Sequence, residues 1–436
     1  MRLAKLYQSS WNSSFFKSVA ILVSGSALAK VAPLLASPVL TRLYTPADFG
    51  LVAVFIAVLS SLSPIICGKY EVAMVLPKSE TEGKELLGIS FGVATVISLT
   101  SLFVVVLFKE NILTFLDASN LENWIYLLPL MLFLTGAMSA MIYYANRRTD
   151  YGRMAKGKMM NSFFITVTSI ALGFLGAGFE GLLAGFFSGA LCATTYLLFL
   201  YRSELTSDLL VWGKEKVALM KQYREFPIFN ATTGLLDGVT LAMPVFFLTN
   251  YFSGAIVGYY ALLLRVADTP LSFIASSVSE VNLKKTADLV NEQTDLRSHL
   301  LKLTLGLSAI VLFPAIILTI FSPTIFSYVF GEEWRESGVY LQILMPALAV
   351  RFVASTLATM ISATHNNHFG AIWKVTAFLV TIIVYGIFAP QRDAILLFKA
   401  VVLMDIMLYL FYWSLIWKSA GNPRNPICRS PREIVQ

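Results

Sequence analysis

The sequence has few charged residues. Only 14% of its 436 residues are Asp, Glu, Lys or Arg, whereas soluble domains carry roughly 25%. Hydrophobic residues make up 57% of the chain. A soluble protein of this composition lacks the polar side chains needed to cover its surface, so lipid must be the solvent for most of the chain. The net charge of +7 is therefore expected to come from loops beside a membrane, and not from nucleic-acid binding.

Motifs for metal, nucleotide or catalytic chemistry are also scarce. The three cysteines are scattered and suggest neither a metal site nor a set of disulfides: Cys67, Cys192 and Cys428. No G-x-x-x-x-G-K-[ST] segment for nucleotide phosphates is present. The pair His365 and His368 has no further clustered ligand. A G-x-S-x-G match at 88–92 lies at the start of an expected membrane helix, not at the strand–turn–helix that the motif requires. We therefore predict no metal, no cofactor and no enzymatic activity.

Long apolar runs, in contrast, recur along the whole chain. About 20 apolar residues cross a bilayer core. Twelve stretches are long enough: 16–40, 49–67, 86–108, 122–145, 159–179, 181–201, 229–250, 255–276, 302–328, 338–363, 369–388 and 394–416. Only Glu180 and its neighbouring glycines separate the fifth stretch from the sixth, which predicts a tight helical hairpin. The sequence thus predicts an all-α membrane protein with about twelve transmembrane helices.

The orientation follows from the basic residues of alternate loops. One set of loops and chain ends carries 24 Lys and Arg residues, and the other set carries 4. Because basic loops stay on the cytoplasmic side, we predict a multi-pass protein with both termini in the cytoplasm. The outer loops are all short. The inner loops 202–228 and 277–301 are long enough to hold amphipathic surface helices.

The two halves of the chain share a short pattern. The segment Leu40–Gly50 leaves the first span and enters the second, and Leu248–Gly258 occupies the same place six spans later. The Leu-Thr pair and the glycine recur at a constant offset of 208 residues. An even number of spans between the copies gives two parallel-related six-helix bundles around a central cavity. We therefore assign four segments: an N-terminal bundle 1–201, a cytoplasmic linker 202–228, a C-terminal bundle 229–417 and a cytoplasmic tail 418–436.

Three segments resemble the Wzx-type polysaccharide flippases of the multidrug/oligosaccharidyl-lipid/polysaccharide exporter superfamily: LTRLYTPADFGLVAVF (40–55), GKYEVAMVLPKSETEGKELLGIS (68–90) and GAIVGYYALLLRVADTPLSFIASSVSEV (254–281). The resemblance implies a bacterial inner-membrane protein that flips undecaprenyl-pyrophosphate-linked sugar repeat units, as in O-antigen and lipopolysaccharide synthesis. Its implied partners are that lipid-linked glycan, membrane lipids, and the polymerase and chain-length proteins of the same route.

Charged residues within the spans are the candidate site, because a charge at mid-membrane costs at least about 2.5 kcal/mol and must face a cavity or a partner. The candidates for an anionic substrate are the cations Lys30, Arg265, Arg351 and Lys374. The candidates for coupling to a proton or Na⁺ gradient are the acids Asp237, Asp268 and Asp405. The alternative is intramembrane ion pairing, above all between Arg265 and Asp268 at i, i+3, and Lys374 is close enough to the inner edge to snorkel.

Glu71 and Glu280 lie at matching inner ends of two spans. Either is a candidate gate at the cytoplasmic mouth, and the alternative is an ordinary interfacial carboxylate. The sequence favours a flippase that works by alternating access. Three rivals remain at this point, and one of them is a non-transporting partner in a glycan-synthesis complex. A multidrug or organic-cation exporter of the same superfamily would be expected to have an acidic cavity, and a membrane polysaccharide polymerase or ligase would be expected to have a long outer loop.

Overall fold

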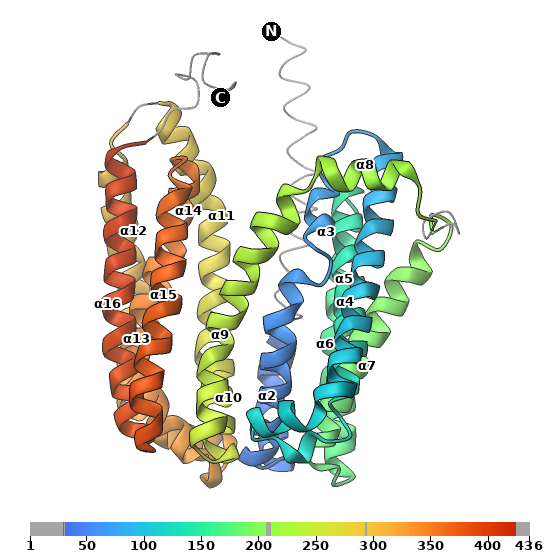
Figure 1. The fold of residues 1–436 in the computed structure, drawn as a ribbon. Coiled ribbons are helices and arrows are strands. Elements are labelled where there is room, and N and C mark those ends of the chain that lie inside the picture. The colour runs from blue at the N-terminus through green and yellow to red at the C-terminus, as the bar shows by residue number, and fades with distance from the viewer. Residues whose placement is uncertain (1–28, 30, 206–210, 293, 424–436) are drawn as a thin grey trace. The chain divides into compact units, whose positions relative to one another are not determined.

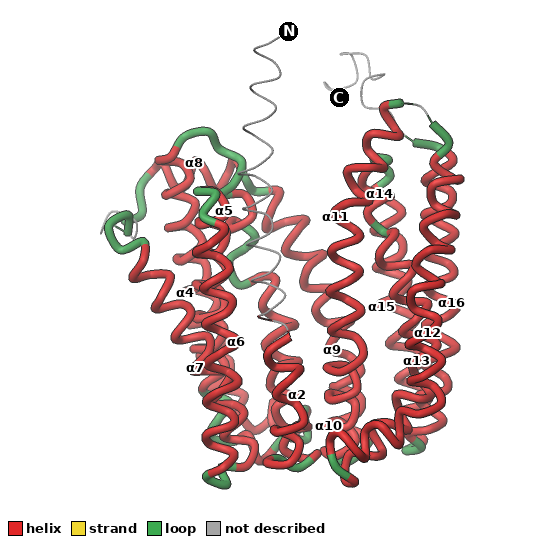
Figure 2. The backbone as a smooth tube through the Cα atoms, turned by 180° about the vertical axis from the view of Figure 1, so that it is seen from behind, coloured by secondary structure: helices red, strands yellow, loops and turns green. Residues whose placement is uncertain are grey.

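The computed structural model describes residues 29, 31–205, 211–292 and 294–423, and within these ranges the chain is helical without a strand (Figure 1, Figure 2). Ten helical segments of this part are long and apolar enough to cross a membrane. The predicted all-α membrane fold is confirmed. Most of the first predicted span lies outside the described residues. Its described part belongs to the short apolar helix Val31–Leu43. The fifth is a helix that is not among the ten, because its first turns carry three cations.

The chain divides into two compact units between Gly258 and Tyr259. The first unit contains α2 (Pro46–Leu62), α3 (Tyr70–Ala73), α4 (Glu80–Phe115), α5 (Leu127–Arg147), α6 (Tyr151–Phe174), α7 (Gly178–Leu200), α8 (Lys214–Gln222), α9 (Thr232–Tyr251) and the start of α10 (Gly254–Leu263). The second contains the rest of α10, α11 (Thr269–Asn291), α12 (Leu296–Phe330), α13 (Arg335–Leu357), α14 (Thr359–Ala363), α15 (Asn367–Phe388) and α16 (Ala394–Gly421). We call the end of each unit that carries its Lys- and Arg-rich loops the basic end.

The hairpin predicted around Glu180 is present in the first unit. Helix α6 ends at Phe174 and α7 begins at Gly178, and between them Gly176 adopts a φ of +75° that favours glycine. The small residues of α7 face α6. A Cβ atom at Gly185 would lie 2.1 Å from the Ser169 hydroxyl oxygen, so only glycine permits this approach.

The glycine that repeats in the two halves lies at one helix crossing in the first unit. Helix α2 begins at Pro46, after a capping box in which the Asp48 backbone N–H donates to the Thr45 hydroxyl at 3.2 Å. A Cβ atom at Gly50 would lie 2.0 Å from the carbonyl oxygen of Gly254, and one at Gly258 would lie 1.8 Å from that of Pro46. The offset of 208 residues relates Pro46 to Gly254 and Gly50 to Gly258, so each of the two contacts is the repeat of the other. The sequence repeat therefore corresponds to a reciprocal backbone contact between α2 and α10.

The second unit has its apolar core where α11, α12, α13 and α16 meet. Leu300, Leu357 and Ile416 are fully buried in this core. The Ser279 hydroxyl donates to the carbonyl oxygen of Thr356 at 2.9 Å and joins α11 to α13. Trp413 donates from its indole nitrogen to the Thr304 hydroxyl at 3.1 Å and joins α16 to α12. Packing of these long helices fixes the places of the charges they carry.

The two long inner loops differ in structure. Loop 202–228 contains the predicted surface helix, which is α8, and Figure 1 shows it lying across the ends of the longer helices of its unit. Loop 277–301 is largely not a loop, because α11 continues without a break to Asn291. The polar segment 282–288 therefore belongs to α11, which extends beyond its own apolar residues.

Candidate functional site

The predicted site residues fall in different parts of the structure. Arg265, Asp268, Arg351 and Asp405 belong to helices of the second unit and are partly buried there. Glu71 and Asp237 belong to the first unit, at α3 and α9. Lys374 is on α15 and Glu280 is on α11. Lys30 lies outside the described residues, so its predicted role stays a prediction.

Arg265 and Asp268 share a short π-helical turn, Leu264–Asp268, between α10 and α11. Such turns insert an i→i+5 hydrogen bond into an α-helix and are frequent at functional sites. The wider turn rotates residues three positions apart away from each other. No ion pair within 4.0 Å joins Arg265 to Asp268 in the described residues, and the electrostatic partner of Asp268 is Arg351.

Arg351 is the centre of a polar cluster in the second unit. Its guanidinium, on α13, interacts electrostatically with Asp268 from the π-helical turn and with Asp405 from α16. None of the described carboxylates lies within the 4.0 Å of a direct ion pair with Arg351. The cation therefore balances two acids at longer range. Asp268 and Asp405 carry two negative charges against the one positive charge of Arg351. A proton or cation bound at one of the acids would change this balance.

Three tyrosines complete this cluster, and sequence reasoning missed all of them. Tyr260 on α10 forms a side-chain hydrogen bond with Tyr385 on α15. Tyr409 on α16 interacts with the Arg351 charge. The spacing of Asp405 and Tyr409, four residues apart on one helix, was a usable signal, because such residues share a helix face. We call Tyr260, Asp268, Arg351, Tyr385, Asp405 and Tyr409 the polar cluster.

Aromatic rings enclose the polar cluster along the helices. Away from the basic end, Phe398 stacks on Tyr260 with ring centroids 6.0 Å apart and contacts Tyr340 at 4.8 Å. Toward the basic end, Trp373 lies 5.7 Å from Tyr409 and stacks on Tyr412 at 4.3 Å. The rings reduce access of water to the charges, which strengthens their electrostatic interactions.

Arg265 differs from Arg351 in its surroundings. In the described part of the chain no carboxylate forms an ion pair with Arg265 or acts on it electrostatically. A guanidinium that is partly removed from water without a nearby anion is costly. The position is therefore suited to an anion supplied from outside the protein.

The other predicted residues are less closely associated with the cluster. Lys374 is eleven residues before Tyr385 on α15, which places it about 16 Å away along the helix axis. Asp237 precedes Gly238, where α9 packs on the backbone of Ser60 and Ser61. Glu280 is exposed. Within the second unit, neither Lys374 nor Glu280 is among the electrostatic partners of Arg351.

Glu71 is the most buried carboxyl among the predicted residues, at 4% exposure. It follows Lys69, which adopts a left-handed φ of 61° and places its ammonium group 3.9 Å from the Glu71 carboxylate. The second carboxylate oxygen, Oε2, is buried without a hydrogen-bond partner. Burial raises the pKa of Glu71, and Lys69 opposes this rise only in part.

We expect Glu71→Gln to remove a pH dependence of stability. A carboxyl whose pKa is raised by folding stabilises the folded state while it is protonated, and this contribution is lost as the pH rises through the raised pKa. The melting temperature of the wild type should therefore fall as the pH rises above the ordinary pKa of glutamate, about 4.3, and that of E71Q should fall less. Glu280→Gln, at an exposed carboxyl, is the matched control. Equal slopes for wild type and E71Q would contradict this assignment.

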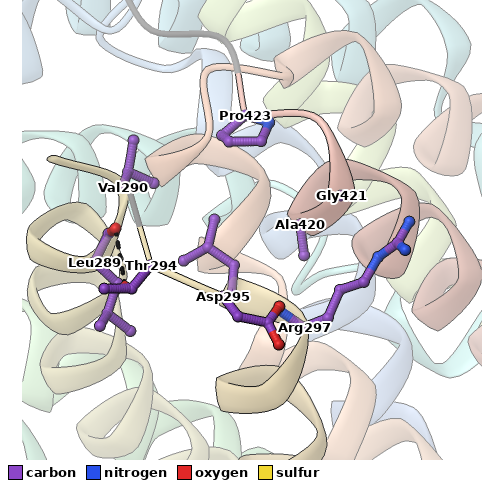
Figure 3. A pocket seen from close by; sticks show the side chains of 9 residues that line it. Leu289, Val290, Thr294, Asp295, Arg297, Ala420, Gly421 and Pro423 are labelled. Carbon is purple, nitrogen blue, oxygen red and sulfur yellow. Dashed lines mark hydrogen bonds between the residues drawn. The ribbon is translucent and has the colours of Figure 1, made fainter. Parts of the chain in front are cut away.

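A cavity of about 460 Å³ lies at the basic end of the second unit, between the start of α12 and the end of α16 (Figure 3). Asp295 accepts from the Arg297 backbone N–H at 3.0 Å and caps α12. The Arg297 side chain stacks on Trp417, with its guanidinium carbon 5.0 Å from the ring centre. Both charged groups of this cavity are thus engaged in local structure, and the cavity is not part of the polar cluster.

Two motifs are candidates for other chemistry, the His365 and His368 pair for metal and the G-x-S-x-G match at 88–92 for a nucleophile. No group of three or more His, Cys, Asp or Glu side chains in that part of the chain has the arrangement of a metal site. His365 is in a turn with a φ of 56°, and the His368 ring packs on Phe369 at 4.1 Å. Gly88 and Gly92 are interior residues of α4, where no nucleophile elbow exists.

The comparison with protein families places the chain clearly. The family profile described as "Polysaccharide biosynthesis protein" matches residues 39–339, more than half of the chain. The "Succinoglycan biosynthesis transport protein ExoT" of Rhizobium meliloti (strain 1021) is 24% identical over 324 residues, which cover 73% of this chain and 63% of that protein. An "Uncharacterized membrane protein in cps region" of Klebsiella pneumoniae is 26% identical over 153 residues, which cover 35% of this chain and 31% of that protein. The chain thus spans less than two thirds of the length of these curated relatives.

Solved structures show the same fold. An inward-facing multidrug resistance MATE family transporter of the MOP superfamily matches with a TM-score of 0.70 and 13% identity, over 93% of this chain and 97% of the other. The lipid II flippase MurJ, in an inward closed conformation, matches with a TM-score of 0.69 and 15% identity, over 91% and 90%. At these identities the likeness concerns the fold alone. The chain therefore belongs to the polysaccharide biosynthesis protein family and has the fold of the MOP transporter superfamily.

Proposed function

We propose that this protein is a flippase that moves oligosaccharide repeat units linked to undecaprenyl pyrophosphate across the bacterial inner membrane by alternating access. Family membership supports a role in polysaccharide biosynthesis. The name of the succinoglycan relative supports transport, and the MurJ fold supports flipping of a lipid-linked molecule. Alternating access is supported by the MATE transporters of this fold, which have been solved in inward-facing and outward-facing conformations.

The observation that carries the proposal is the partly buried Arg265, on which no carboxylate of the described residues acts. A guanidinium can donate two parallel hydrogen bonds to phosphate oxygens, which makes arginine well suited to a pyrophosphate. In this mechanism the pyrophosphate provides the anion for Arg265. The sugar chain passes through the protein beside it, and the polyprenyl tail stays in lipid.

The polar cluster supplies a means of coupling. Asp268 and Asp405 both act on Arg351. A proton or Na⁺ bound at Asp405 would weaken the hold of this acid on Arg351 and make the guanidinium available to the substrate. Loss of the ion would restore the interaction and favour release. Asp237 in the first unit is a second candidate for the coupling ion.

Arg265→Ala is expected to reduce flipping of the lipid-linked glycan at least roughly tenfold, because a charge-assisted contact contributes about 1.5–3 kcal/mol. Folding should be unaffected, since no protein acid loses its partner. Arg335→Ala, at an exposed arginine, is the matched control, and Arg265→Lys should retain part of the activity. The measurement is flipping in proteoliposomes, with surface polysaccharide in a flippase-deficient strain as a second readout.

Wild-type flipping by R265A at equal protein level would contradict the anion role of Arg265. The same vesicles, with and without a proton or Na⁺ gradient, test the acids. Flipping that does not respond to either gradient would remove the coupling role of Asp268 and Asp405. Export of an organic cation in place of the glycan would instead support the rival multidrug function, which the fold also permits.

A further inference from the structure

Helix α8 lies at the basic end of the first unit, across the end of α4 (Figure 1). It is the α-helix of loop 202–228, and none of the polar cluster is on it. One of its faces is buried through Lys216 and Leu219. The Lys216 ammonium donates to the Val211 carbonyl oxygen at 2.7 Å and lies 3.4 Å from the Glu85 carboxylate of α4. This pairing fixes α8 and the residues just before it to the membrane-spanning helix α4.

The opposite face of α8 combines cations with apolar groups. Lys214, Val217, Ala218 and Lys221 follow the i, i+3, i+4, i+7 spacing of one helix face. Together with Trp212 and Gly213 they line a recess of about 590 Å³. Both lysines are exposed, and Val217 retains 46% of its surface. A helix facing water would not be expected to place a valine between its lysines and a tryptophan just before them.

Trp212 ties this recess to the membrane. Its indole packs on α4 at Gly92, where a Cβ atom would lie 2.4 Å from the ring, yet 52% of its surface stays exposed. Gly92 is well inside the apolar part of α4. Tryptophan is favoured at the boundary between headgroups and hydrocarbon, where its ring is apolar and its N–H remains in a polar layer.

We propose that this face of α8 binds the headgroup of an anionic phospholipid of the bilayer. The ammonium groups of Lys214 and Lys221 would contact the phosphate, and Trp212 and Val217 would contact the start of the acyl chains. Basic residues near a membrane surface attract anionic lipid, and helices with this combination of residues lie in the interface. A soluble anion would leave the apolar groups uncovered. The inference does not depend on the proposed function.

The test measures lipid retention by the purified full-length protein with native mass spectrometry, during titration with phosphatidylglycerol or phosphatidylcholine. Wild type should retain phosphatidylglycerol preferentially. The double variant K214A/K221A should bind it roughly tenfold more weakly. The double variant K78A/K156A removes two exposed lysines from the same end of the same unit and should bind as wild type. W212A should weaken retention of both lipids.

Three results would overturn the proposal. Equal losses in the two double variants would mean that charge acts generally and not at α8. Equal retention of the two lipids by wild type would mean that no headgroup is selected. Displacement of phosphatidylglycerol by sub-equimolar undecaprenyl phosphate would mean that the occupant is a polyprenyl lipid and not a bilayer phospholipid. Circular dichroism of each variant establishes that the helices are retained.

Discussion

Replacing Gly258 with alanine should destabilise the protein by at least about 2 kcal/mol and abolish polysaccharide delivery. The added Cβ atom would lie 1.8 Å from the Pro46 carbonyl oxygen and 2.7 Å from its carbon. These are backbone atoms, so no change of side-chain rotamer relieves the overlap, and α2 and α10 must separate. The measurement is the melting temperature of the detergent-solubilised protein, together with surface polysaccharide in a flippase-deficient strain.

The repeat gives this prediction a symmetric partner and a close control. Gly50→Ala should have a comparable effect, because its Cβ atom would lie 2.0 Å from the Gly254 carbonyl oxygen. Gly254→Ala should be tolerated, since an added Cβ atom has no neighbour within 4 Å. All three glycines lie at the same crossing. If G258A and G254A melted at the same temperature, the close contact of α2 with α10 would be refuted.

Removing Arg351 should be the most damaging change in the polar cluster. Arg351→Ala leaves Asp268 and Asp405 without the cation that acts on both. Because the interaction is longer than a direct ion pair, the loss of stability should be less than the roughly 3–5 kcal/mol of a broken buried pair. Asp405→Asn in the same chain removes one of the two acids, so R351A/D405N should recover part of the lost stability. The measurement is a double-mutant cycle on thermal unfolding in detergent, with Arg335→Ala as the control on the same helix.

The stability result distinguishes the two arginines. Loss of Arg351 should lower both stability and transport, whereas loss of Arg265 should lower transport alone, because no acid depends on Arg265. A double variant no more stable than R351A would show that Asp405 and Arg351 are not coupled. If R351A were as stable as the wild type, Asp268 and Asp405 would have to be uncharged in the absence of Arg351.

Sequence reasoning found the charges but not their partners. Arg351, Asp405 and Asp268 were identifiable because a charge within an apolar run is costly unless it has a purpose. Their association depends on how α13 and α16 are rotated against the π-helical turn, and uniformly apolar spans carry no periodicity that fixes this rotation. Tyr260 and Tyr385 were overlooked because tyrosine is common in membrane helices and has no formal charge.

The sequence by itself determined the membrane environment, the helical class and nearly all the spans, because hydrocarbon requires long apolar helices with internally satisfied backbones. It also determined the repeat, through Gly50 and Gly258. Only the tertiary structure decided that these glycines meet the backbone of the opposite copy. It alone showed that Arg265 and Asp268 share a π-helical turn and that Arg351 balances Asp268 and Asp405. These outcomes depend on helix rotation and local backbone geometry, which arise from packing between segments far apart in the chain.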